Sequence, residues 1–77
     1  MRITKLALPQ RVKVIKPREI IVIRKQLRVS QPVFATLLNV PVATARSWEQ
    51  GTRSPSGAAL RLLDIVRRNP DVLVPTH

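Results

Sequence analysis

The chain of 77 residues contains no cysteine, and its only histidine is the last residue, His77. Without cysteine, neither a disulfide nor a thiolate metal site can reinforce so short a fold. A single terminal histidine cannot build a histidine-based metal site, and it leaves the hydroxyls of Ser30 and Ser47 without a base to activate them. The composition therefore argues against an enzyme and predicts that the protein uses no metal and no cofactor.

Long apolar runs are also missing. No stretch approaches the roughly 20 apolar residues that a membrane span needs. Pro9, Arg11 and Lys13 interrupt the apolar residues of the N-terminal segment, which therefore does not have the form of a signal peptide. We expect a cytoplasmic protein of one domain. A chain of this length buries only about 60 to 65% of its unfolded surface, so its fold is only marginally stable alone. With disulfides and metal sites excluded, we expect dimerisation to stabilise it.

Acidic residues are scarce: 4 Asp and Glu stand against 14 Lys and Arg, which gives a net charge of +10 and a pI near 12.0. Such an imbalance points to a polyanionic partner, either nucleic acid or an anionic membrane surface. The basic residues do not lie opposite one apolar stripe of a long helix, which argues against the membrane. A basic tail kept for solubility is the other interpretation. Most of the charge lies in residues 1–28, whereas residues 30–51 hold the only tryptophan, no lysine and one arginine.

Prolines and capping residues divide the chain into short elements. Pro17 suits the first turn of a helix, Ser30 and Ser56 are good N-caps, and Asn39 and Gly51 can end helices in a left-handed conformation. The apolar spacing between them predicts helices at about residues 17–27, 31–38, 42–50 and 57–68, with a further helical turn in residues 70–74. The expected fold is therefore all-α, with four to five short helices.

A short strand is expected before the first helix. Val12 and Val14 alternate with basic residues across Arg11–Lys16, although Ile15 breaks the alternation at its end. An isolated strand cannot satisfy its backbone hydrogen bonds, so we expect it to pair with its counterpart in a second subunit. Disorder of this segment is the alternative.

The two short helices at 31–38 and 42–50, joined by a three-residue turn, form a helix-turn-helix pattern. Ala45 and Trp48, together with Val40 before them, form the expected inward face of the second helix. The outward face consists of residues at positions i, i+1, i+4 and i+5: Val42, Ala43, Arg46 and Ser47. In a major groove the first two can touch thymine methyls, Arg46 can bind guanine as a bidentate donor, and Ser47 can donate or accept.

Extra lysines on this helix would bind any DNA sequence equally well, so a helix that reads bases needs few of them. We therefore expect the contacts with phosphate to come from residues around the helix. Gln31 stands at a helix N-terminus, where backbone amides and the helix dipole suit an anion. The other expected contacts with the DNA backbone are Thr44, Gln50, Thr52 and Arg53. The last helix carries more apolar residues than one buried stripe needs, which suggests a partner subunit. The candidates for the dimer interface are Val12, Val14, Leu62, Ile65 and Val66.

The segment 17–70 resembles a known family. Its pattern "SQ…FA…WEQG.R.PSG", with Arg24 and Leu38, is similar to the lambda-repressor-like (Xre) helix-turn-helix domain, and within it to HigA-type antitoxins and related small bacterial regulators. The resemblance implies a DNA-binding domain over residues 17–74, with a basic arm in 1–16 and a tail in 75–77. It also implies an ion pair between Arg24 and Glu49.

Function follows from the resemblance as an expectation. It implies a homodimeric repressor on a palindromic operator in double-stranded DNA. It further implies the antitoxin of a type II toxin–antitoxin system, which represses its own operon and neutralises an mRNA-cleaving toxin. A stand-alone bacterial or phage regulator without a toxin is the alternative. Three roles remain open for the basic arm: it wraps a toxin surface, it extends the contact with DNA, or it serves only the dimer.

Three residues depart from the family pattern. Arg28 stands where glycine usually follows the first helix, and we expect it to carry a positive φ at some cost. Asn39 replaces a frequent glycine. Pro41 stands where a Ser or Thr usually caps the reading helix, which leaves the start of that helix, and so the register of the base contacts, open.

Overall fold

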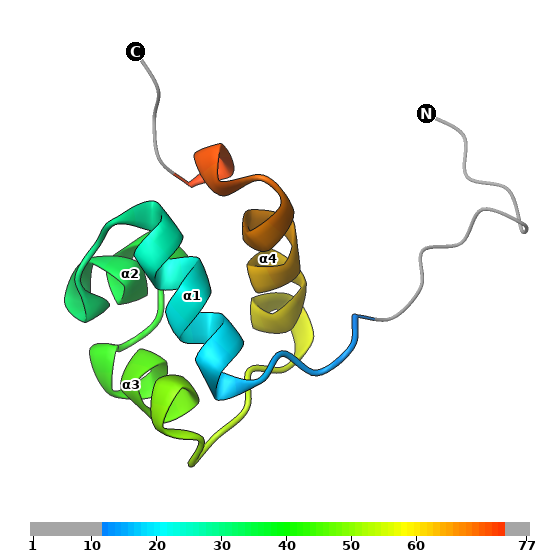
Figure 1. Cartoon of the computed structure of the whole chain (residues 1–77). Helices are drawn as coiled ribbons and strands as arrows, with labels where there is room; N and C mark the ends of the chain where they lie inside the picture. Colours follow the sequence, from blue (N-terminus) through cyan, green and yellow to red (C-terminus); the bar gives the residue numbers. More distant parts are fainter. Residues whose placement is uncertain (1–11, 74–77) are drawn as a thin grey trace, which may run out of the picture.

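The computed structural model describes residues 12–73, which fold into four α-helices and one 3₁₀ turn (Figure 1). The α-helices are α1 Pro17–Leu27, α2 Gln31–Leu38, α3 Val42–Gln50 and α4 Gly57–Arg68. The 3₁₀ turn, η2, is Pro70–Val72. The predicted all-α class and helix bounds are confirmed for this part of the chain. None of the helices described there is long and apolar enough to cross a membrane.

Local chemistry explains where the helices begin. The Glu19 carboxylate accepts a hydrogen bond from the backbone N–H of Lys16 at 3.0 Å, which satisfies one unpaired donor at the start of α1. Ser30 caps α2 as predicted, because its hydroxyl accepts from the Val33 N–H at 3.4 Å. Ser56 occupies the N-cap position of α4, but its side chain makes no capping hydrogen bond, so its predicted role is wrong.

The helix ends use left-handed backbone. Arg28 has φ of 59° and Asn39 has φ of 58°, as the sequence predicts. Asn tolerates this conformation better than Arg, so Arg28 carries the larger strain. Gly51 ends α3 with φ of 82°, and a Cβ added there would lie 3.3 Å from Pro17 Cγ. Glycine at this position therefore permits both the turn and the close approach of α3 to the start of α1.

The strand predicted at Arg11–Lys16 is not present in the single chain. Residue 11 lies outside the described residues, and residues 12–16 run without regular secondary structure. Their burial also differs from the expected alternation: Ile15 is 2% exposed, whereas Val14 is 73% exposed. Ile15, which breaks the alternation expected of a strand, is thus the residue that packs in the core. It does so because this segment lies against the helical bundle.

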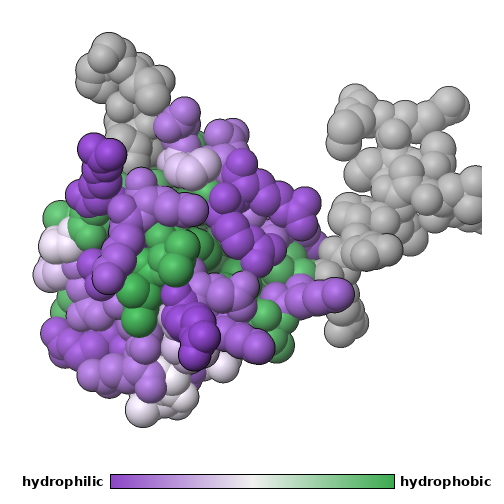
Figure 2. Space-filling model, viewed as in Figure 1, coloured by the Kyte–Doolittle hydropathy of each residue, from purple (hydrophilic) through white to green (hydrophobic). Residues whose placement is uncertain are grey.

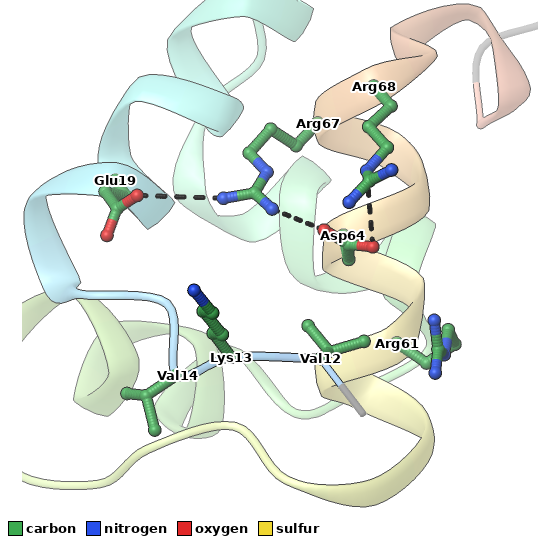
Figure 3. A pocket seen from close by; sticks show the side chains of 8 residues that line it. All are labelled: Val12, Lys13, Val14, Glu19, Arg61, Asp64, Arg67 and Arg68. Atoms are coloured by element: carbon green, nitrogen blue, oxygen red, sulfur yellow. Dashed lines mark hydrogen bonds and ion pairs between the residues drawn. The ribbon is translucent and has the colours of Figure 1, made fainter. Parts of the chain in front are cut away.

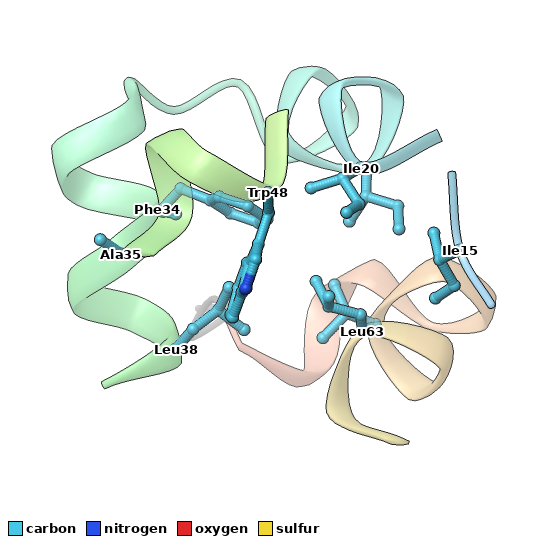
Figure 4. Packing of buried hydrophobic residues seen from close by; sticks show 10 residues of the cluster. Ile15, Ile20, Phe34, Ala35, Leu38, Trp48 and Leu63 are labelled. Carbon is cyan, nitrogen blue, oxygen red and sulfur yellow. The ribbon is translucent and has the colours of Figure 1, made fainter. Parts of the chain in front are cut away.

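One apolar core joins all four helices. Trp48 of α3 lies between Phe34 and Leu38 of α2 on one side and Leu63 of α4 on the other (Figure 4). Its side chain is 4% exposed and fills the junction where α3 meets the rest of the bundle. Trp48 therefore helps to fix the orientation of α3, because an aromatic side chain removes a large apolar area from water when it is buried.

A charged network ties α4 to the start of α1 (Figure 3). The Arg67 guanidinium pairs with Asp64, and at 3.7 Å with Glu19, while Arg68 Nε lies 3.4 Å from Asp64. Burial of the Asp64 carboxylate acts to raise its pKa, but the hydrogen bonds and charges of the two arginines outweigh this effect and hold the pKa below its ordinary value. The network lines a cavity of about 560 Å³ between residues 12–14 and α4.

Candidate nucleic-acid interface

The helices α2 and α3 pack against each other and lie together at one side of the bundle, away from α4 (Figure 1). The turn between them is Asn39–Pro41, and the N–H of Val40 donates back to the Ala35 carbonyl at 3.0 Å. Pro41 is the N-cap of α3 and supplies no side-chain hydrogen bond. The first turn of α3 therefore begins at Val42 without a capping hydroxyl, and this gives the register of its outward face.

The two faces of α3 differ sharply in exposure. Ala45 is 0% and Trp48 is 4% exposed, and Val40 packs against the same core. On the opposite side Ala43, Arg46 and Gln50 are exposed. Residues spaced by three and four positions follow one another along one side of a helix, so these three form the centre of the outward face.

The other residues expected on α3 lie at the borders of that face. Val42, Thr44 and Ser47 are partly buried, and Val42 also packs against the core. Gln50, which is expected to contact the DNA backbone, is more central on this face than Val42, which is expected to contact bases. Helical spacing alone would have placed Gln50 four residues after Arg46, on the same side.

The polar groups of this face have different hydrogen-bonding states. Within the described residues, Arg46 makes no hydrogen bond or ion pair, so its guanidinium is available to a ligand. Ser47 Oγ donates to the Thr44 carbonyl at 2.7 Å. The outward face thus combines an unengaged donor at Arg46 with a hydroxyl at Ser47 whose proton is already in use.

The loop after α3 is closed onto a single carbonyl. The backbone N–H groups of Gly51, Thr52 and Arg53 approach the Ser47 carbonyl at 2.9, 3.0 and 3.3 Å, and the Thr52 hydroxyl lies 3.4 Å from it. These bonds satisfy the end of α3 and hold Thr52 and Arg53, both exposed, beside its C-terminus. Gln31 is partly buried at the N-terminus of α2.

An ion pair fixes α3 against α1. Arg24 Nε donates to Glu49 Oε2 at 2.8 Å and its Nη2 donates to Oε1 at 3.1 Å. The same guanidinium donates through Nη1 to the Val29 carbonyl at 3.2 Å, so one side chain joins α1, the loop before α2 and α3. The hydrogen bond with Glu49 outweighs the effect of burial and raises the pKa of Arg24.

The five candidates for a dimer interface differ in accessibility. Val14 and Ile65 are 73% and 42% exposed, whereas Val12 and Leu62 are partly buried. Val66 is 0% exposed within the single chain, so it belongs to the core and its expected place in the interface is wrong. The helical spacing that identified these residues does not tell which of two apolar sides faces the bundle.

Another exposed apolar side chain lies on α1. Figure 2 shows a largely hydrophilic face with an apolar area over α1, and Val22 of that helix is 52% exposed. It lines a shallow cavity of about 290 Å³ together with Ile23 and Arg67. In residues 12–73 there is no group of three or more His, Cys, Asp or Glu side chains that could hold a metal ion.

One known protein is similar in sequence to most of the chain. No protein-family model matches the chain. Antitoxin HigA-2 of Vibrio cholerae serotype O1 (strain ATCC 39315 / El Tor Inaba N16961) is 46% identical to it over 59 residues, which make up 77% of this chain and 57% of the antitoxin. The predicted resemblance to HigA-type antitoxins is confirmed by this relative, and the chain spans a little over half of the relative's length.

Proposed function

We propose that this chain, a homologue of Antitoxin HigA-2, is a sequence-specific DNA-binding repressor that serves as the antitoxin of a type II toxin–antitoxin system. In this role it represses its own operon and neutralises an mRNA-cleaving toxin, and it is not an enzyme. The observation that carries the proposal is the 46% identity to an antitoxin, together with an exposed face of α3 that a DNA groove can receive.

The DNA-binding part of the proposal uses α3 as the reading helix. Each subunit of a homodimer places α3 in the major groove of one half-site of a palindromic operator, with the two half-sites about 34 to 36 Å apart. The proposed base contacts are Val42, Ala43, Arg46 and Ser47. The proposed contacts with the DNA backbone are Gln31, Thr44, Gln50, Thr52 and Arg53.

The geometry of residues 24–53 supports this arrangement. Trp48 and the ion pair between Arg24 and Glu49 hold α3 against the bundle, so that the helix backbone is in place before DNA arrives. A helix held in this way loses little backbone freedom on binding, which preserves affinity. The high net charge of +10 supplies the general attraction for phosphate.

The dimer is proposed to close through the extended segment and α4. Val14 and Ile65 are the most exposed of the five interface candidates, and a second subunit would cover them. Residues 12–15, which have no strand partner within the described part of the chain, would then gain one from the second subunit, as the alternation of Val12 and Val14 suggests. Size measurement by multi-angle light scattering on the wild type and on Ile65→Glu tests this interface.

The toxin-binding part of the proposal has a separate test. The chain is co-expressed with the small open reading frame adjacent to its own gene, and growth is compared with expression of that reading frame alone. Growth arrest by the neighbour and rescue by this chain support the antitoxin role. A neighbour that is harmless, or toxicity that the chain does not relieve, favours the alternative, a stand-alone Xre-type regulator.

A further inference from the structure

We infer that Ser47 reads DNA as a hydrogen-bond acceptor only, and so selects a base with an exocyclic amino group, adenine or cytosine, at its position in the half-site. The inference rests on the proposed function and specifies the chemistry of one of its contacts. A serine hydroxyl in general both donates and accepts, and for this reason the residue type alone does not distinguish among the four bases.

The hydroxyl proton of Ser47 is already engaged inside α3. Ser47 Oγ donates to the Thr44 carbonyl at 2.7 Å, which is the usual length of a good O–H···O hydrogen bond. A hydroxyl has one proton and two acceptor lone pairs. What Ser47 offers outward is therefore acceptor capacity alone.

The surroundings keep this oxygen within reach of a ligand. Ser47 is partly buried, but Ala43, one turn earlier on the same side of α3, is exposed and has only a methyl group. A short side chain at this position leaves the neighbouring hydroxyl uncovered and allows the helix backbone to approach a groove closely.

Accepting a hydrogen bond is also the more favourable role energetically. To donate to a base, the hydroxyl must give up its bond with the Thr44 carbonyl, so one hydrogen bond replaces another and little is gained. To accept from a base, it keeps that bond and adds a second. The difference in free energy between the two roles is what produces discrimination between bases.

The bases differ in the group that they present in the major groove. Adenine N6 and cytosine N4 carry amino donors, whereas thymine O4 and guanine O6 are acceptors. Guanine or thymine opposite Ser47 would bring two acceptors together. Arg46, the preceding residue, is donor-only and has no partner in the described part of the chain, so the two neighbours read groups of opposite polarity.

Selection from a random duplex pool, followed by anisotropy on the enriched operator, tests the inference. Wild type, Ser47→Ala and Ser47→Thr are compared. We expect the wild type to prefer adenine or cytosine over guanine or thymine at one position by roughly three- to tenfold. Ser47→Ala, which preserves the helix, loses this preference and keeps the rest of the half-site. Ser47→Thr retains the hydroxyl and the preference.

Base analogues identify the amino group directly. At the selected position, adenine is replaced by purine, which lacks the N6 amino group, or cytosine by pyrimidin-2-one, which lacks N4. Each analogue is expected to weaken binding of the wild type but not of Ser47→Ala. A preference for guanine or thymine, or equal losses for both proteins, overturns the inference and leaves the proposed function standing. If the wild type enriches no sequence, the proposed function falls and the inference falls with it.

Discussion

Arg24 of α1 and Glu49 of α3 are joined by two parallel hydrogen bonds of 2.8 and 3.1 Å, the bidentate fork typical of an arginine with a carboxylate. Their side chains are 20% and 6% exposed, so water competes little for either partner. Glu49 follows directly after Trp48, which packs in the core. A buried aromatic residue and its charged neighbour therefore fix the same turn of α3 from two directions.

Replacing this carboxylate should destabilise the fold. Glu49→Gln leaves the Arg24 guanidinium without its charged partner, and we expect the free energy of unfolding to fall by about 1.5–3 kcal/mol. Urea denaturation followed by circular dichroism measures the change. Asp71→Asn makes the same chemical substitution at an exposed position and should change stability by less than about 0.5 kcal/mol. Equal effects of the two substitutions would contradict the role given to the ion pair.

The anchoring of the N-terminal segment can be tested with two adjacent residues. Ile15→Ala removes a side chain that is 2% exposed and should cost about 2–4 kcal/mol of stability. Val14→Ala removes one that is 73% exposed and should cost less than about 0.5 kcal/mol in the monomer. Thermal unfolding of both variants at low protein concentration gives the comparison. A larger loss for Val14→Ala would mean that the segment packs by the alternation predicted for a strand.

Asp64 makes stability depend on pH. Its pKa in the folded chain lies below the ordinary value of 3.8, because Arg67 and Arg68 stabilise the carboxylate more than its burial disfavours it. A carboxyl whose pKa is lowered by folding contributes stability above the unfolded pKa, and this contribution is lost as the pH falls through the folded value. Asp64→Asn should therefore be less stable than the wild type at pH 7, and the difference should shrink below pH 3.8.

Urea denaturation of wild type and Asp64→Asn at both pH values gives this difference. Because both proteins carry every other acidic group, subtracting their unfolding free energies isolates the titration of Asp64. A difference that stays constant, or grows, as the pH falls would show that the two arginines do not stabilise the carboxylate.

Arg46 and Arg53 should differ in what they contribute to DNA binding. Arg46→Ala removes the unengaged guanidinium of the outward face, and we expect a loss of about 1–3 kcal/mol with relaxed preference at one base pair. Arg53→Ala should weaken all duplexes alike and reduce the slope of log K against log salt by about 1. Titrations on specific and scrambled duplexes at several salt concentrations separate the two effects. Equal losses on both duplexes for both variants would refute these roles.

Most of the fold could be predicted because its boundaries depend on local chemistry. Pro17, Ser30, Asn39 and Gly51 begin or end helices through their own backbone preferences or their capping hydrogen bonds, and each does so where the sequence predicts. The face of α3 that turns outward could also be predicted, since helical periodicity places Ala45 and Trp48 opposite Arg46.

Apart from the missing capping hydrogen bond of Ser56, the errors concern contacts between distant parts of the chain. Alternation around Ile15 indicates two sides of an extended segment, but not which side meets α4. Val66 was expected at an interface for a similar reason. The sequence of a helix with two apolar sides does not reveal which side packs against the core of its own chain. The ion pair between Arg67 and Glu19 brings together α4 and α1, and no local pattern signals it, whereas the pair between Arg67 and Asp64 lies within α4 at i,i+3 spacing.

The proposed function requires that α3 reads a DNA sequence. It is tested most directly by fluorescence anisotropy with a duplex from upstream of the chain's own gene, beside a scrambled duplex, across a range of salt concentration. We expect a preference of about 10³-fold or more for the upstream duplex at physiological salt, with a residual preference that high salt does not remove. Binding that falls in parallel and steeply on both duplexes would contradict it, and would show a protein that binds phosphate without reading bases.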